Sequence, residues 1–110
     1  MRTIQRALRR GVPVIRLVGE VGAESAEQVG AELYAAFKSS DGRVLLDLRP
    51  TVHLHYRVAA LLVGAALCRR RLGVVGPTPY IRQILRFAGA LEEDVREYRD
   101  LGEALGDPAA

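Results

Sequence analysis

The chain has 110 residues, which predicts a single domain with its core at about residues 3–105 and a frayed tail at 106–110. Hydrophobic residues make up 49% of the sequence and the net charge is only +3, so a disordered chain and a strongly basic nucleic-acid binder are both disfavoured. A single cysteine excludes an internal disulfide, and the longest uncharged run, residues 58–68, is too short to span a membrane, so we expect a cytoplasmic protein.

The N-terminal part of the chain predicts a β-hairpin. Residues 3–8 and 12–18 are strand-like runs, and residues 9–11 between them form a turn signal that ends in glycine. Pro13 has no N–H to donate to a neighbouring strand, which favours a position at the start of a strand or at a sheet edge. The glycines of the segment 19–22 then predict a break in the chain before the first helix.

The first helix is predicted to begin after Ser25. Gln28 lies three residues beyond this N-cap candidate, which is the spacing of a capping box. Apolar residues then follow at helical spacing: Val29, Leu33, Ala36 and Phe37. Turn residues at 39–42 end the helix, and residues 43–48 form a short apolar run that is typical of a buried parallel strand.

A second helix is predicted from Tyr56 to about Arg70. It is apolar almost all round, so it should be buried on several sides or pack against a partner. Residues 72–75 then predict a short strand.

Thr78 caps the third predicted helix, with Pro79 in its first position and Gly89 as its natural C-terminal cap. Its expected inner face comprises Ile81, Ile84, Leu85 and Ala88. Val95 and Tyr98 suggest a last strand, and residues 100–105 a short final helix. The alternation of strands and helices predicts an α/β fold: a mixed, mostly parallel sheet of four to five strands with an N-terminal hairpin and about four helices.

Three segments together resemble a known family. Residues 14–21 (VIRLVGEV), 43–48 (RVLLDL) and the run VVGPTPYIRQILRFAG at 74–89 are similar, in order and spacing, to the STAS domain (sulphate transporter and anti-sigma factor antagonist). The resemblance covers about residues 3–105. It implies the STAS fold and a signalling role that works by contact between proteins and not by catalysis.

The segment that carries regulation in this family differs here. Anti-sigma factor antagonists have an Asp-Ser-Ser/Thr-Gly sequence at the start of the second helix, and a partner kinase phosphorylates its second hydroxyl. The resemblance puts His55, Tyr56, Arg57 and Val58 at these four positions, so Arg57 occupies the degenerate phospho-acceptor position. Neither Ser nor Thr occurs between Thr51 and Thr78. The usual phospho-switch should therefore be absent.

The same segment is the predicted partner-binding surface. Its residues are His53, His55, Tyr56, Arg57, Val58 and Leu61. The resemblance implies a protein partner: an anti-sigma-factor kinase, another STAS protein or a transport ATPase, in which case the chain would be an accessory subunit. Self-association through the apolar second helix is a further option. The alternatives are a small anion or nucleotide bound near Arg57 and an arginine stem that merely covers apolar surface.

Other chemistries are disfavoured. His53 and His55 lie two residues apart, as metal ligands on one strand face can, but neither an acid nor a thiol adjoins them. Hydroxyls and the thiol of Cys68 stand in caps, turns or a helix interior and not at a nucleophile elbow. The arginines 69–71 are better explained as a helix end than as a nucleic-acid contact. We expect no catalysis, cofactor or metal.

Overall fold

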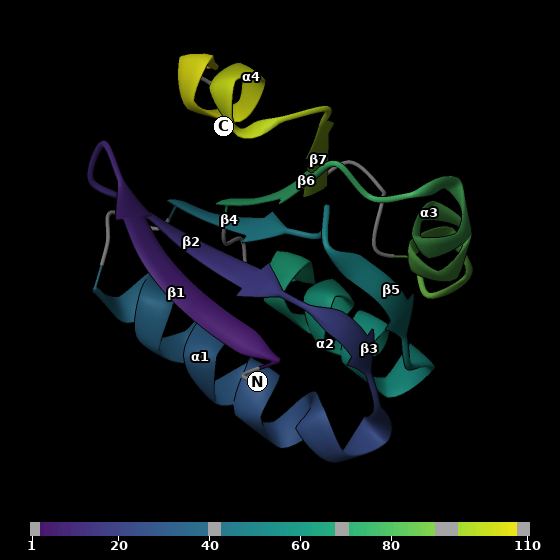
Figure 1. Ribbon diagram of the computed structural model, residues 1–110. Helices are drawn as coiled ribbons and strands as arrows, with labels where there is room; N and C mark the ends of the chain where they lie inside the picture. Colours follow the sequence, from purple (N-terminus) through teal and green to yellow (C-terminus); the bar gives the residue numbers. More distant parts are fainter. Residues whose placement is uncertain (1–2, 40–42, 68–70, 90–94, 108–110) are drawn as a thin grey trace.

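The centre of the molecule is a five-stranded sheet, seen in the computed structural model in Figure 1, which describes residues 3–39, 43–67, 71–89 and 95–107. The side chains of residues 63 and 65–67 lie outside that description. So do the predictions for Cys68, Arg69 and Arg70, for the end of the first helix at 40–42 and for residues 108–110 of the tail predicted at 106–110.

The strands of this main sheet have the order β1-β2-β4-β6-β7. They are β1 (Ile4–Arg9), β2 (Val12–Leu17), β4 (Arg43–Asp47), β6 (Arg71–Val75) and β7 (Val95–Tyr98). β1 and β2 are antiparallel, whereas β2, β4, β6 and β7 run parallel. The predicted mixed, mostly parallel sheet with an N-terminal hairpin is therefore confirmed.

The hairpin turn consists of Arg10 and Gly11, both with positive φ (50° and 78°), as a two-residue turn between twisted strands requires. Pro13 is buried in β2, which lies between β1 and β4, so the option of an edge strand is wrong. The other option, a position near the start of the strand, is confirmed: β2 begins at Val12, and its pairing with β4 begins only at Val14. The missing N–H is therefore not needed for that pairing.

A second, two-stranded sheet was not predicted. β3 (Gly19–Val21) and β5 (Thr51–Leu54) pair in parallel, although we expected a chain break at the first place and predicted no strand at the second. Strands of three and four residues are too short for a clear alternation of apolar and polar residues, and their pairing partner is distant in sequence. Gly19, with φ +77°, redirects the chain from β2 into β3.

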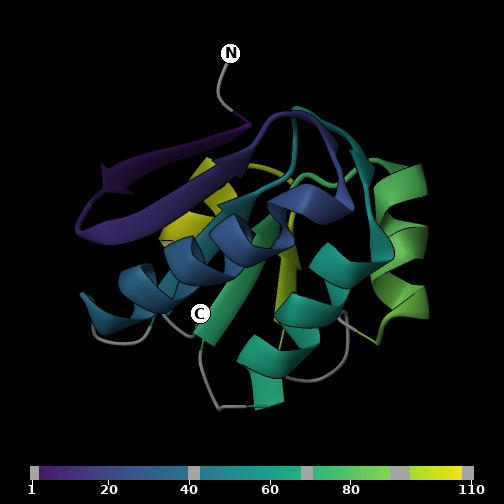
Figure 2. The same cartoon turned by 90° about the horizontal axis from the view of Figure 1, so that it is seen from below.

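The helices are distributed unequally over the main sheet. α1 (Ala26–Lys38) and α2 (Tyr56–Leu67) cover one face, α4 (Leu101–Gly106) covers the other, and α3 (Pro79–Phe87) packs beside β5 and α2 (Figures 1 and 2). Among the described residues, the helices are all too short or too polar to cross a bilayer.

Two of the three predicted helix caps are present. Thr78 Oγ1 accepts a hydrogen bond from the Ile81 N–H at 3.2 Å, and Gly89 follows α3 with φ +79°. The capping box at Ser25 is wrong, because its side chain makes no cap bond. A 3₁₀ turn (Ala23–Ser25) precedes α1 and holds Ser25 in helical conformation, whereas a capping residue needs extended backbone.

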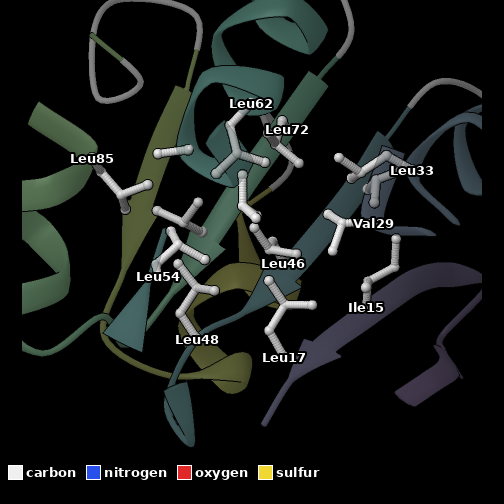
Figure 3. Close-up of a cluster of buried hydrophobic side chains, with 14 of the residues drawn as sticks. Ile15, Leu17, Val29, Leu33, Leu46, Leu48, Leu54, Leu62, Leu72 and Leu85 are labelled. Atoms are coloured by element: carbon white, nitrogen blue, oxygen red, sulfur yellow. The ribbon is translucent and has the colours of Figure 1, made fainter. Parts of the chain in front are cut away.

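The larger hydrophobic cluster lies between the sheets and the helices on their shared face. Figure 3 shows Leu17 and Leu46 from the main sheet meeting Val29 of α1, Leu54 of β5 and Leu62 of α2, all at most 1% exposed. Core residues from α1, α2, α3 and β5 thus share one cluster. The position of β5 and α2 is fixed by this packing.

A smaller cluster fills the opposite face of the sheet. Tyr98 of β7 lies across β6 with its hydroxyl donating to a carboxylate oxygen of Asp107 at 2.8 Å. The ring takes the space that a side chain at position 73 would need, since a Cβ on Gly73 would lie 2.9 Å from carbon atoms of both Tyr98 and Leu45. Gly73 is therefore required by packing and not by backbone conformation.

We predict that Gly73→Ala lowers the free energy of unfolding by about 1–3 kcal/mol, because the added methyl group overpacks the site between Tyr98 and Leu45. Gly64→Ala is the matched control: Gly64 is exposed on α2 with open space around its Cα, and alanine there should add up to about 1 kcal/mol. Urea unfolding of both variants measures the difference. Equal changes in the free energy of unfolding for the two variants would contradict the packing role of Gly73.

Candidate functional site

The predicted partner-binding residues lie at the end of β5 and the start of α2. Tyr56 and Arg57 are exposed, whereas His53, His55 and Leu61 are half-buried. Their binding role stays a prediction. Val58 was included in that surface, but its side chain is fully buried in the core, so it cannot contact a partner directly.

The segment that leads to this surface is held by β3. Thr51 is buried, and its hydroxyl donates to the Leu17 carbonyl at 2.7 Å. The Gly19 N–H donates to the Pro50 carbonyl at 2.9 Å, and the His55 N–H donates to the Val21 carbonyl at 2.8 Å. These bonds, made at both ends of β5, determine where α2 begins.

A buried carboxylate ends the central strand just before this segment. Asp47 is 2% exposed, and its two oxygens accept hydrogen bonds from Nε and Nη2 of Arg49, both at 2.9 Å. The Arg49 N–H donates to Oδ1 at 3.1 Å, and Nε of Arg16 lies 3.6 Å from Oδ2. Burial by itself raises the pKa of Asp47, but these bonds and the two positive charges outweigh it, so the pKa lies below the ordinary value of 3.8.

The next loop leaves room for Arg49. Gly76 follows β6 with φ +59°, and a Cβ there would overlap the aliphatic part of the Arg49 side chain. The Gly76 N–H donates to the Tyr98 carbonyl at 2.7 Å. Arg49 therefore joins the carboxyl ends of β4 and β6, from which the chain continues to β5 and α3.

His55 caps α2. Its Nδ1 accepts a hydrogen bond from the Arg57 N–H at 3.1 Å, and its carbonyl accepts from the N–H groups of Val58 and Ala59. Because Nδ1 accepts, this bond requires the tautomer with hydrogen on Nε2. The His55 side chain thus takes the capping role that Ser, Asp or Asn has in most helices. The Arg57 N–H, one of the first N–H groups of α2, therefore already has a hydrogen-bond acceptor.

His53 is joined to the third helix. Its Nδ1 and the hydroxyl of Tyr80 are 2.7 Å apart, and the two rings stack with centroids 5.8 Å apart. The two histidines thus have different partners: one orders α2 and the other links β5 to α3. Among the described residues, three His, Cys, Asp or Glu side chains are nowhere grouped in a way that would hold a metal ion.

Beside the predicted surface lies an apolar groove of about 690 Å³, hereafter the α2–α3 groove. Its lining includes three exposed aromatic side chains: Tyr56 (70% exposed), Tyr80 (54%) and Phe87 (98%). Ala60 of α2 and Ile84 of α3 line it as well.

Sequence reasoning found Tyr56 but missed Tyr80 and Phe87. Ile84 was assigned to the inner face of α3, and it does pack against the core, but it is only half-buried and also lines the groove. The available signal was a second apolar face on α3. Tyr80, Ile84 and Phe87 recur at spacings of four and three residues, separate from the buried pair Ile81 and Leu85.

Similarity to known proteins agrees with this architecture. A family model described as Mlab, STAS domain matches residues 4–96. The fold is similar to that of SpoIIAA, a Bacillus cell fate determinant, in its phosphorylated form (21% identity, TM-score 0.68, covering 93% of this chain and 96% of that one). It is also similar to an anti-sigma-factor antagonist (STAS) domain protein from Planctomyces limnophilus (20%, 0.74, 93% and 94%).

A glutamate-for-serine variant of RsbS from Moorella thermoacetica has the same fold as well (16% identity, TM-score 0.74, covering 94% of this chain and 92% of that one). At such identities the likeness is one of fold. Among curated proteins, none matches the chain in sequence.

The pKa of Asp47 has a consequence for acid stability. A carboxylate whose pKa is lower in the folded state stabilises that state above the unfolded value, and the contribution disappears as the pH falls below 3.8 through the folded pKa. We predict that Asp47→Asn lowers the free energy of unfolding by about 1.5–3 kcal/mol near pH 7. The difference from the wild type should shrink towards about pH 3.

Urea unfolding at a series of pH values measures this difference. Glu27→Gln, which removes an exposed acid from the first turn of α1, is the control and should show a small difference at neutral pH. A loss in Asp47→Asn that is independent of pH would contradict the ionic role.

The cap of α2 gives a second prediction. His55→Ala should lower the free energy of unfolding by about 0.5–2 kcal/mol, because the Arg57 N–H loses its acceptor. His55→Asn should recover most of this loss, because the asparagine oxygen can accept the same bond. Thermal unfolding of the two variants compares them, and equal destabilisation would argue against a capping role.

Proposed function

The chain belongs to the STAS domain family, and from this premise we propose that it is a non-catalytic protein-interaction module of bacterial signalling that works without the family's Ser/Thr phospho-switch. The proposal depends chiefly on one observation. An exposed arginine, Arg57, stands in the first turn of α2, at the position to which the family resemblance assigns the phosphorylated hydroxyl.

The Ser/Thr hydroxyls that flank this position in the sequence, Thr51 and Thr78, both make bonds within the fold. Thr51 is buried and donates to the Leu17 carbonyl, and Thr78 caps α3 through its Oγ1. A phosphate on either would disrupt a bond of the fold instead of adding charge to an exposed helix start. Regulation by a phosphate at the start of α2 is therefore disfavoured, and we propose that the surface is constitutive or controlled in another way.

We propose that partners dock on the exposed side chains Tyr56 and Arg57, with His53, His55 and Leu61 at the margin. Aromatic and arginine side chains are the residues that most often dominate binding energy in protein interfaces. The candidate partners are an anti-sigma-factor kinase, another STAS protein or a transport ATPase. A small anion at this helix start is less well supported, because the His55 side chain already accepts the Arg57 N–H that an anion would use.

We predict that Arg57→Glu and Tyr56→Ala each weaken capture of a partner from a cell extract about tenfold or more, because both remove a central anchor of the surface. The bait is the full chain, and mass spectrometry identifies the captured protein, which should be one of the three candidate kinds. Arg9→Glu is the charge-matched control at the distant hairpin and should leave capture unchanged. If Arg57→Glu and Tyr56→Ala both captured the partner as well as the control does, the proposed surface would be refuted.

A further inference from the structure

We propose that the α2–α3 groove is the docking site for an amphipathic helix of an acidic partner protein. This inference rests on the proposed function and specifies the chemistry of its partner. The groove lies between the start of α2 and the neighbouring helix α3 and has an apolar lining, as in proteins that bind a helix in a groove.

The lining leaves space for a helix to approach closely. Ala60 lines the groove on α2, and Gly64, one turn further along the helix, is exposed as well, so both residues offer little bulk. On α3, Ile84 and Ala88 are half-buried and open into the groove. A partner helix can therefore place its apolar residues against Ala60 of α2 and against Ile84 and Ala88 of α3.

Three aromatic side chains border this space and remain more than half exposed. Phe87 is 98% exposed although it is a large hydrophobic residue, and Tyr56 and Tyr80 are more than half exposed. Contiguous exposed apolar surface of this kind marks interaction sites in soluble proteins. Rigid aromatic rings also bury much area with little loss of side-chain freedom on binding.

Two positive charges flank the groove. Arg57 follows Tyr56 on α2, and Arg86 lies one turn beyond the groove residue Gln83 on α3; both are exposed, and within the described part of the chain neither has an ion-pair partner. By contrast, Arg82 on the same helix is paired with Glu97 at 2.6 Å. Unpaired cations beside an apolar groove favour acidic residues at the edges of the bound helix.

The same charges disfavour a second copy of this chain as the occupant. Two grooves packed face to face would bring the Arg57 and Arg86 side chains of both copies together. Like charges in an interface oppose association. A partner with its own acidic residues removes this repulsion and pairs both guanidinium groups.

A display library tests the proposal. Its members are amphipathic peptides about three to four helical turns long, with fixed leucines at one face and Glu, Lys or Gln randomised beside it. The immobilised full-length chain selects binders, and sequencing counts the charges. The variants are Phe87→Ala and Arg86→Glu, both at exposed positions, and Leu8→Ala on distant β1 is the control. Thermal unfolding checks that all three remain folded.

We expect selected peptides to be rich in Glu. Their affinity should fall about tenfold with Phe87→Ala and remain unchanged with Leu8→Ala, and Arg86→Glu should weaken the preference for Glu. No selected binder, selection of lysine-rich peptides, or equal binding to Phe87→Ala would overturn the proposal. So would light scattering that shows a dimer of the wild type that Phe87→Ala dissociates, because the occupant would then be a second copy.

The capture experiment separates this inference from the proposed function. If Arg57→Glu abolishes capture of the cellular partner while Phe87→Ala leaves it intact, the interaction module stands and the groove is refuted as its docking site. If Phe87→Ala reduces capture of the cellular partner while Arg57→Glu leaves it unchanged, the surface at the start of α2 fails and the groove remains.

Discussion

The ion pair between Asp47 and Arg49 at the end of β4 is the constraint on which the arrangement of the site depends. A carboxylate that is 2% exposed is tolerated only when its oxygens are bonded, and here three hydrogen bonds come from a residue two positions later. Those bonds require the chain to turn at once after the strand. The turn also requires glycine at position 76, because a Cβ there would overlap the aliphatic part of the Arg49 side chain.

From this turn the chain enters β5, which pairs with β3 and not with the main sheet. The separate pairing directs β5 away from β4 and brings its end beside α3, where His53 meets Tyr80. His55 then caps α2 within one residue of the strand's end. The groove between α2 and α3 therefore follows from backbone pairing, a few polar contacts and the shared core packing of these elements.

The sequence predicted well the elements whose signals are local. β4 has three consecutive apolar residues at 44–46 between turn signals, and Thr78, Pro79 and Gly89 mark α3 by capping chemistry alone. The predictions that were wrong concern features that depend on other parts of the chain. β3 and β5 are too short to show a period, and Ser25 loses its cap because of the 3₁₀ turn before it. The burial of Val58 follows from which side of α2 faces the sheet, and an almost wholly apolar helix gives little sign of that.

Arg57 illustrates the separation between fold and surface. A cation in the first turn of a helix opposes the helix dipole, so stability alone would favour an acid or a hydroxyl there. α2 has no acid in its first turn, and His55 supplies the cap, so the helix is formed without help from position 57. The arginine side chain is exposed and contributes little to the core. Because the fold does not need a cation at this position, the exposed Arg57 supports the partner-binding surface that we propose at the start of α2.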